Sequence, residues 1–194
     1  MPPVKRPRSS PAREVEILET VLRLVAHDGY DAVTMDAVAA AAHASKATLY
    51  RRWPSKADMI VDAVRRHIGT VAVPVPTGTL RGDLIQVLSQ VAEQLTSDDL
   101  ALQLIAPAHH DPELMKALEI KVREPARIVM RILLERAVAQ GELTSLSEPD
   151  LPHDVAMPML LDALLWGRPV DADLVAHIVD RVLLPLLEAW STVG

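Results

Sequence analysis

The 194-residue chain contains no cysteine and no phenylalanine, and only three tryptophans and two tyrosines. The absence of cysteine excludes disulfide bonds, thiol catalysis and cysteine-based zinc sites. It also agrees with a reducing compartment, so we expect a cytoplasmic protein. No apolar run reaches the ~18 residues that a membrane-spanning helix needs, and no membrane partner is expected. With so few aromatic side chains, the core has to be built from Leu, Val, Ile, Ala and Met. Together with the shortage of strand-like alternation, this predicts an all-α fold.

Charge is divided unevenly along the chain. Residues 1–56 contain nine Lys/Arg against six Asp/Glu, whereas residues 57–194 contain eleven against twenty. A basic end on an acidic body favours one nucleic-acid-binding face. The N-terminus is basic and lacks the apolar centre of a signal peptide, so we expect a disordered arm over residues 1–12. Such an arm either contacts DNA, as homeodomain arms do, or is simply a solvated tail.

The segment Thr34–Lys56 has the pattern of two short helices joined by a tight turn. Thr34 can cap the first helix and Ser45 the second. On the second helix Leu49 and Trp53 lie four residues apart, so both are expected to face inward. Two caps, a short turn and an inward apolar pair together predict a helix-turn-helix unit.

The outward face of the second predicted helix suits DNA chemically. Lysine and arginine neutralise phosphates, and the hydroxyls of Ser, Thr and Tyr add hydrogen bonds to them. The N-terminal end of a recognition helix enters the major groove, so Lys46, Ala47 and Thr48 are expected nearest the base edges. The alternative is an ordinary solvated turn. The remaining residues expected on or beside this face are Ser45, Tyr50, Arg51 and Arg52.

This segment resembles the DNA-binding region of the TetR family of bacterial transcriptional regulators. The resemblance is carried by Thr34, Val38, Ala39, Ser45, Lys46, Thr48, Leu49, Tyr50, Trp53, Pro54, Ser55 and Lys56. It implies a DNA-binding domain of three helices over residues 13–56. Its implied DNA contacts are Lys46, Thr48, Tyr50, Arg51, Arg52 and Lys56, with Thr34 reaching a phosphate. The family usually has glycine in the turn, where this chain has His43, a residue type that tolerates positive φ at some strain.

Downstream of the helix-turn-helix the sequence predicts further helices. The proline-punctuated stretch Val71–Gly78 is expected to be a connector, followed by a helix over Leu80–Leu95. A short helix is expected to end at Pro107, and Pro125 is expected to kink or break a later segment. By the resemblance, residues 57–194 form a helical ligand-binding and dimerisation domain, which gives about nine helices in the whole chain.

The last two predicted helices, Asp150–Trp166 and Asp171–Trp190, are unusually rich in apolar residues and are joined by a short turn. A helix that is apolar on more than one side is buried on more than one side. We expect this hairpin to form a dimer interface, because closed twofold dimers are the commonest oligomers. The alternative is a thick core within one chain. The predicted interface residues are Val155, Met159, Leu160, Ala163, Leu164, Ile178, Val182, Leu183, Leu186 and Leu187.

Enzyme chemistry is poorly supported by the sequence. His109, His110 and Asp111 are adjacent, but adjacent histidines point in different directions on a helix, and no second ligand pair has fixed spacing. The chain also has no glycine-rich phosphate loop and no G-x-S-x-G elbow. We therefore expect no enzyme, no metal and no cofactor.

The functional prediction is a TetR-type regulator, a homodimer that binds double-stranded operator DNA. We expect a repressor that an unknown small-molecule ligand releases from a palindromic operator. The alternative is an all-α small-molecule carrier or protein-interaction module without sequence-specific DNA binding, against which the basic cluster in Lys46–Lys56 argues. The residues that either line the ligand pocket or only pack the core are Met59, Val91, Leu95, Leu102, Ile105, His109, Met115, Met130 and Trp166.

Overall fold

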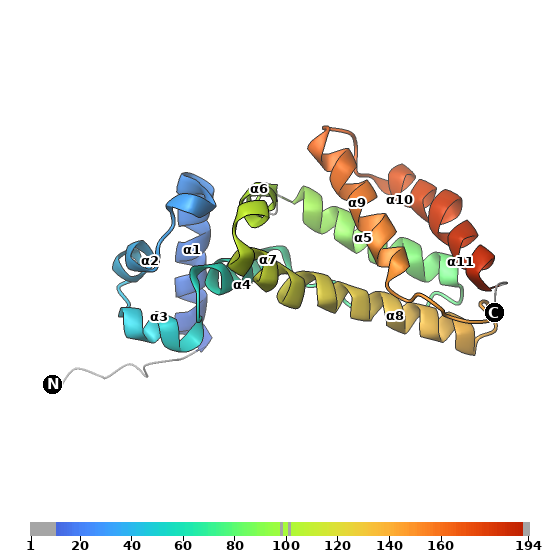
Figure 1. Ribbon diagram of the computed structural model, residues 1–194, viewed down its shortest axis with the longest axis horizontal. Coiled ribbons are helices and arrows are strands. Elements are labelled where there is room, and N and C mark those ends of the chain that lie inside the picture. Colours follow the sequence, from blue (N-terminus) through green and yellow to red (C-terminus); the bar gives the residue numbers. More distant parts are fainter. Residues whose placement is uncertain (1–10, 98, 101, 192–194) are drawn as a thin grey trace. The chain divides into compact units, whose positions relative to one another are not determined.

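The computed structural model describes residues 11–97, 99–100 and 102–191 of the chain (Figure 1). Helix is the only regular secondary structure in these residues. The elements are α1 (Pro11–Ala32), α2 (Met35–Ala41), α3 (Lys46–Arg52), α4 (Lys56–Ile68), α5 (Leu80–Thr96), α6 (Leu102–His110), α7 (Pro112–Leu118), the π-helical segment η1 (Glu119–Arg123), α8 (Glu124–Ala139), α9 (Leu151–Leu165), α10 (Ala172–Ile178), the π-helical segment η2 (Val179–Leu183) and α11 (Leu184–Ser191). The runs α7–η1–α8 and α10–η2–α11 are each continuous. The described residues therefore form nine helices, and the all-α prediction is confirmed.

The predicted N-terminal arm lies almost entirely outside the described residues. Its last two residues, Pro11 and Ala12, are already helical, because α1 begins at Pro11. Near its other end α1 contains Gly29, with φ 78° and ψ 167°, so the helical path is interrupted there. Only glycine adopts this conformation without steric cost. The interruption lets Tyr30 turn into the core, where 2% of its surface is exposed.

The described helices fall into two compact units. The first unit contains α1–α4 up to His67, together with Leu100–Lys121, which carries α6 and α7. Within it α2 contacts both α1 and α3, and α6 contacts α1. Its core consists mainly of aliphatic side chains and methionine, with one tryptophan and one tyrosine, and burial of a large apolar side chain contributes about 1.5–3 kcal/mol. The fully buried side chains include Val21, Val25, Val38, Leu49, Trp53, Met59, Ile60 and Leu114.

The second unit contains α5 and α8–α11. Helix α5 is central to its packing, because it contacts α8, α9, α10 and η2. Thr79 caps α5 by accepting a hydrogen bond from the Gly82 amide at 3.1 Å, and the predicted connector Val71–Gly78 precedes that cap without regular structure. The core is built from aliphatic residues, as the composition predicts, and includes Leu84, Val87, Leu133, Leu134, Leu160, Ile178 and Leu183.

Neither of the two prolines that were expected to interrupt a helix ends one. Pro125 does not break its helix, because the π-helical segment η1 ends at Arg123, just before α8, and its wider turn accommodates the missing proline N–H. Pro185 follows η2 in the same way. The expectation that Pro107 ends a helix is wrong, because α6 continues to His110. One N–H is lost there, while the Pro107 carbonyl still accepts from the Asp111 amide at 3.0 Å.

The first unit extends beyond the predicted DNA-binding residues 13–56, since it also includes α4, α6 and α7. Packing alone does not say which residues bind DNA or a ligand, so the functional boundary after residue 56 stays a prediction. Among the described residues, no group of three or more His, Asp or Glu is arranged to hold a metal ion. None of the described helices is both long and apolar enough to span a bilayer.

Candidate DNA-binding site

Helix α3 begins and ends where the sequence predicts. Ser45 Oγ accepts a hydrogen bond from the Thr48 amide at 3.1 Å, and the two hydroxyls lie 2.8 Å apart. At the other end Trp53 has left the helical conformation, with φ −125°. Helix α2 is capped in the same manner, because Thr34 Oγ1 accepts from the Ala37 amide at 3.1 Å. Such caps contribute about 1 kcal/mol each, which helps to define two helices of only seven residues.

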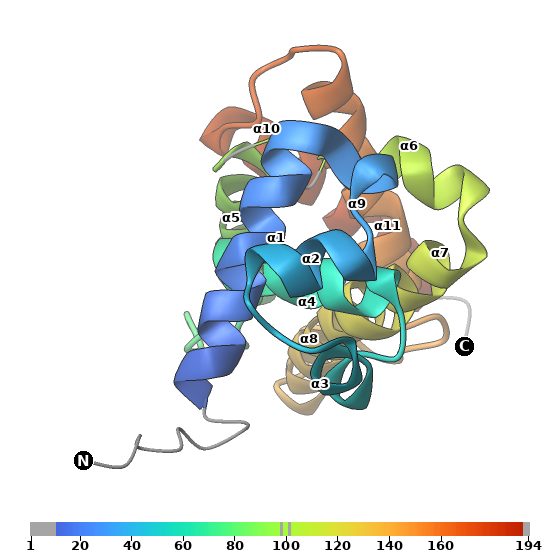
Figure 2. The same ribbon diagram turned by 90° about the vertical axis from the view of Figure 1, so that its left-hand side faces the viewer.

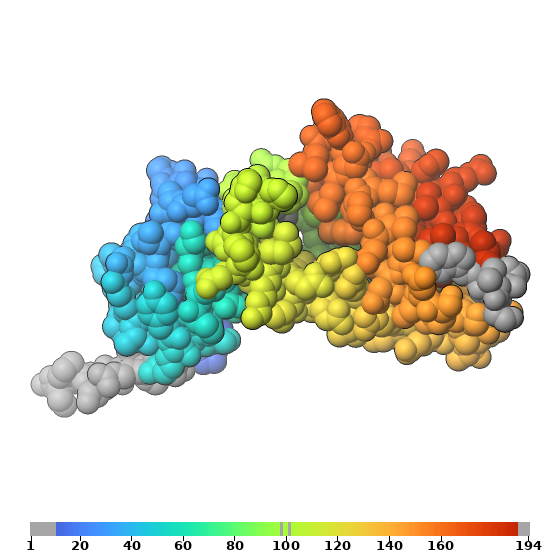
Figure 3. Space-filling model, in the orientation of Figure 1, coloured from blue at the N-terminus to red at the C-terminus, as the bar shows by residue number. Residues whose placement is uncertain are grey.

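The inward and outward faces of α3 are those predicted. Leu49 is fully buried, and Trp53 is 2% exposed. The Trp53 indole Nε1 donates to Asp62 Oδ2 at 3.0 Å, which satisfies the polar atom of this buried ring. Tyr50 lies on the other side and is 52% exposed. The remaining exposed residues of α3 are Lys46, Ala47, Arg51 and Arg52, and the helix lies at the surface of its unit (Figures 2 and 3).

The turn between α2 and α3 has the strained residue expected from its sequence. His43 has φ 49°, and it is the one non-glycine residue with positive φ in the described chain. The sequence did not predict how this turn is held. Two of its carbonyl oxygens, those of Ala42 and His43, accept hydrogen bonds from the Arg13 guanidinium of α1.

Two of the predicted DNA contacts pair with acidic residues of the same unit. Arg52 donates from Nε and Nη2 to the two carboxylate oxygens of Glu14, at 2.9 and 2.8 Å. These hydrogen bonds hold the pKa of the Glu14 carboxyl below its usual value, against the opposing effect of partial burial. Lys46 forms an ion pair with Asp36. Exposed ion pairs contribute little, about 0–1 kcal/mol, so DNA phosphates can compete for both cations.

Lys56 differs from the other predicted DNA contacts, because it is half-buried inside the unit. Its Nζ donates to the Tyr30 carbonyl at 3.2 Å and lies 4.1 Å from the centroid of the Tyr30 ring. The Tyr30 hydroxyl donates to Asp111 Oδ2 at 2.6 Å. Lys56 therefore has packing contacts inside the unit, and its assignment as a DNA contact stays a prediction.

The same contacts tie α7 to the end of α1. Asp111 caps α7 by accepting from the amides of Glu113 and Leu114, at 2.9 and 3.1 Å. The hydrogen bond from Tyr30, followed by the one from the Leu114 amide, lowers the pKa of the Asp111 carboxyl. Burial, and then the hydrogen bond to Asp111, raise the pKa of the Tyr30 phenol well above its ordinary value. The Tyr30 phenol therefore stays protonated and the Asp111 carboxyl stays ionised, as the hydrogen bond between them requires.

The predicted dimer-interface residues divide into two groups. One group is buried within the chain itself and cannot meet a partner without unfolding, which corrects their assignment: Leu160, Ala163, Ile178, Leu183 and Leu187. The helices of this hairpin pack against α5 and against each other within the second unit. The other group keeps part of its surface exposed, so its assignment stays a prediction: Val155, Met159, Leu164, Val182 and Leu186.

The tentative ligand residues are divided between the two units. Met59 and Met130 are core residues, and Leu95 is also buried. Trp166 is 78% exposed at the end of α9. Exposed residues on α6 and α7 are Ile105, His109 and Met115, whereas Val91 and Leu102 are half-buried. Exposure alone does not decide whether Trp166 contacts a ligand, so the assignment of these nine residues stays a prediction.

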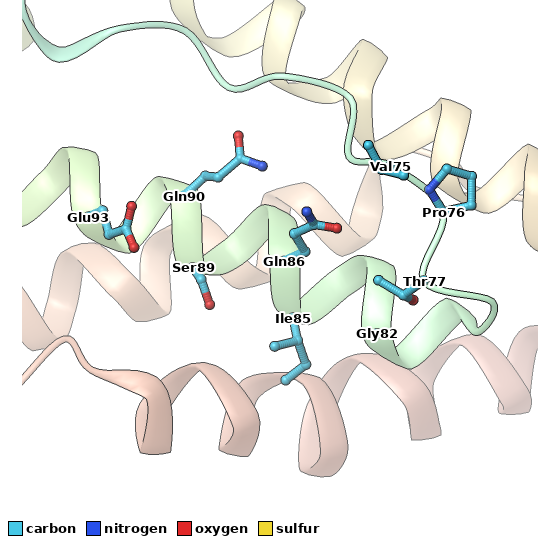
Figure 4. Close-up of a pocket in the computed structure, with 9 residues that line it drawn as sticks. All are labelled: Val75, Pro76, Thr77, Gly82, Ile85, Gln86, Ser89, Gln90 and Glu93. Atoms are coloured by element: carbon cyan, nitrogen blue, oxygen red, sulfur yellow. The ribbon is translucent and has the colours of Figure 1, made fainter.

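A groove of about 640 Å³ lies in the second unit, and sequence reasoning missed it. It runs between α5 and the connector, where Gln86 and Gln90 extend toward the side that carries Val75 and Pro76 (Figure 4). The Ala72 amide donates to Gln90 Oε1 at 3.1 Å, so the connector is anchored on α5. Gln86 Oε1 is buried and has no hydrogen-bond partner among the described residues. The remaining lining residues are Thr77, Gly82, Ile85, Ser89 and Glu93.

An all-α chain with two capped short helices, a tight turn and an outward basic face defines a helix-turn-helix DNA-binding protein. Comparison with known proteins agrees. Residues 17–63 match the family described as bacterial regulatory proteins, tetR family. Residues 74–182 match the family described as tetracyclin repressor-like, C-terminal domain. The chain belongs to the TetR family and is a helix-turn-helix transcriptional regulator.

Individual relatives support the same assignment. A DNA-binding transcriptional repressor, TetR, of Mycobacteroides abscessus is 38% identical, over 90% of this chain and 94% of that protein. An uncharacterised HTH-type transcriptional regulator of Mycobacterium tuberculosis is 36% identical, over 90% of this chain and 88% of that protein. The crystal structure of another TetR family regulator superposes with a TM-score of 0.68 and 26% identity, over 88% of this chain and 96% of that one. These relatives are regulators rather than enzymes.

Proposed function

We propose that this chain is a cytoplasmic repressor that binds a palindromic operator as a homodimer and is released by a small-molecule ligand. The observation that carries the DNA-binding part is the exposed face of the capped helix α3, with Lys46, Tyr50 and Arg51 outward. The relative from Mycobacteroides abscessus is described as a DNA-binding transcriptional repressor, which supports repression rather than activation.

We assign the DNA contacts as follows. Lys46, Ala47 and Thr48 lie in the first turn of α3, the end of a recognition helix that enters the major groove. Tyr50 and Arg51 contact phosphates from the same face. The remaining proposed contacts are made by Thr34, Ser45 and Arg52, which already form hydrogen bonds within the unit.

Lys46→Ala and Tyr50→Ala are each expected to weaken operator binding about tenfold or more, because each removes a contact from both subunits. Neither should change the thermal unfolding curve, since both side chains are exposed. Lys116→Ala, which removes an exposed lysine of α7, is the matched control and should bind as the wild type does. Fluorescence anisotropy with a duplex selected from a random library measures all three. Full affinity in both α3 variants would exclude α3 as the DNA-reading helix.

The dimer is proposed to form through the hairpin α9–α11. Its support is the set of apolar residues that remain partly exposed on both helices, including Met159, Leu164 and Val182, beside the exposed Leu165 and Trp166. Such a surface on two adjacent helices suits a four-helix bundle with a second copy.

Leu164→Glu is expected to produce folded monomers, because an unpaired charge would be desolvated in the interface but not in the isolated chain. Leu183→Glu should instead unfold the second unit, since Leu183 is fully buried within the chain. Sedimentation velocity at micromolar concentration, with circular-dichroism melts, separates the two outcomes. A Leu164→Glu variant that remains a dimer of wild-type stability would place the interface elsewhere.

The groove beside α5 is the proposed ligand site. The buried, unpartnered Gln86 Oε1 favours a ligand that donates a hydrogen bond through a hydroxyl or an amide, while Val75 and Ile85 offer apolar contact. Compounds that raise the wild-type melting temperature in a library screen should lose this effect in Ser89→Trp, which fills the groove. Unchanged shifts in that variant would rule the groove out as the ligand site.

A further inference from the structure

The first turn of α1 holds both ends of the recognition helix. Arg13 Nη2 donates to the Ala42 carbonyl and, at 3.1 Å, to the His43 carbonyl, directly before the cap of α3. Arg13 Nη1 donates to Glu16 Oε2 at 2.7 Å, which orients the guanidinium. The next residue, Glu14, accepts both hydrogen bonds from Arg52, the last residue of α3. Two consecutive residues of α1 therefore bracket α3.

Arg13 binds the turn where its backbone is strained. The amides of Ala42, His43 and Ala44 bond backwards to carbonyls of α2, at 2.8, 3.2 and 2.9 Å. The Ala42 and His43 carbonyls are left to Arg13. A non-glycine residue at φ 49° is disfavoured, so the turn needs outside contacts to keep it there. Hydrogen bonds from a charged donor are among the stronger contacts available for this purpose.

We propose that Arg13 and Glu14 are positioning residues, which fix the placement of α3 and thereby set how well the protein distinguishes its operator from other DNA. Base contacts tolerate errors of only about 0.5 Å and 10–20°, whereas phosphate attraction is far less sensitive to geometry. Loosening α3 therefore lowers specific binding more than non-specific binding. This inference rests on DNA recognition through α3.

The test compares two duplexes of equal length: one selected from a random library by the wild-type protein, and a scrambled version of it. Arg13→Ala should lower affinity for the selected duplex about tenfold or more, because both charge-assisted hydrogen bonds to the turn are lost, and should change affinity for the scrambled duplex little. Its salt dependence should match the wild type, because Arg13 is not a phosphate contact. Arg23→Ala removes an exposed arginine elsewhere on α1, whose Nη2 donates to Thr20. This control should leave unchanged the ratio of the affinity for the selected duplex to that for the scrambled duplex.

Glu14→Gln should change the same ratio by a different route. It weakens the hold on Arg52 and removes a negative charge, so the affinity for the scrambled duplex should rise while the ratio falls. Glu19→Gln, at an exposed position of the same helix, is the control for the charge change alone. An affinity ratio in Glu14→Gln equal to that of Glu19→Gln would overturn the role of Glu14.

Rescue distinguishes positioning from folding. Glycine at position 43 removes the strain that Arg13 opposes, so the double variant Arg13→Ala/His43→Gly should recover most of the lost specific affinity. The recovery in the double variant is expected even if Arg13→Ala alone is unfolded. A double variant that is unfolded, or that is folded without recovered specificity, overturns the inference, as does a salt slope in Arg13→Ala reduced by about one per subunit. A wild-type protein that selects no duplex contradicts the proposed function itself.

Discussion

Trp53→Ala is expected to lower the free energy of unfolding by about 3–5 kcal/mol, the range for deletion of a buried large aromatic side chain. Trp53 is 2% exposed, so the substitution leaves a cavity beneath α3. It also removes the indole donor of Asp62, whose other carboxylate oxygen lies 3.0 Å from Lys121 Nζ. Loss of operator binding should follow from loss of the folded first unit rather than from loss of a DNA contact.

Two further variants separate these effects in urea unfolding followed by circular dichroism. Trp53→Phe keeps most of the buried surface but removes the hydrogen bond to Asp62, so it should lower the free energy of unfolding less than Trp53→Ala does. Tyr50→Ala removes an exposed ring, so its free energy of unfolding should lie within about 0.5 kcal/mol of the wild-type value. A Trp53→Ala protein as stable as Tyr50→Ala would contradict the assignment of Trp53 to the buried side of α3 and Tyr50 to its exposed side.

The second large effect concerns salt. A dimer that engages ~6–10 phosphates should lose a factor of about 10³–10⁵ in affinity between 50 and 200 mM salt. The exposed cations Lys46 and Arg51 supply part of this dependence, and phosphates must displace the Asp36 and Glu14 carboxylates from Lys46 and Arg52.

Single variants locate the contacts. Lys46→Ala should reduce the salt slope by about one per subunit. Lys56→Ala should lower stability, because its ammonium group is bound to Tyr30 inside the unit, and a slope that also falls by about one per subunit would identify Lys56 as a phosphate contact. Anisotropy titrations at several salt concentrations measure both slopes. A flat wild-type response would remove Lys46 and Arg51 as phosphate contacts.

The features that the sequence predicts well are those decided by neighbouring residues. Thr34 and Ser45 cap helices through hydrogen bonds to amides three residues away, so their role is visible in the local sequence. The inward placement of Leu49 and Trp53 follows from helical spacing. His43 occupies the positive-φ position of the turn because chain reversal requires such a residue there.

Contacts between residues far apart in the sequence could not be predicted. Arg52 reads as a DNA contact from its helix position, and only the folded unit brings it against Glu14 of α1. Lys56 likewise reads as one more basic residue until Tyr30 is seen beside it. In both cases the folded chain gives the charge a partner that its local sequence pattern does not reveal.

The hairpin α9–α11 illustrates a limit of apolar patterning. Leu183 and Leu164 look equivalent in sequence, yet Leu183 is fully buried within the chain and Leu164 is half-buried. Apolar residues on two sides of a helix indicate that both sides are buried. They do not indicate whether the same chain or a second copy buries them. The predicted ligand residues show the same limit, because apolar side chains such as Met59 and Met130 are buried, and apolar character alone does not distinguish a pocket lining from a packed core.

Sequence-specific recognition by a dimer is tested most directly by repeated selection from a random duplex library, followed by footprinting of the enriched duplex. We expect a palindrome whose two half-sites lie about one helical turn apart or a multiple of that, both protected at the same protein concentration. Substitution of one half-site should lower affinity by about 10²–10⁴, because the tethered second contact is lost. Failure to enrich any sequence, or tight binding of a monomer to one unpaired half-site, would contradict it.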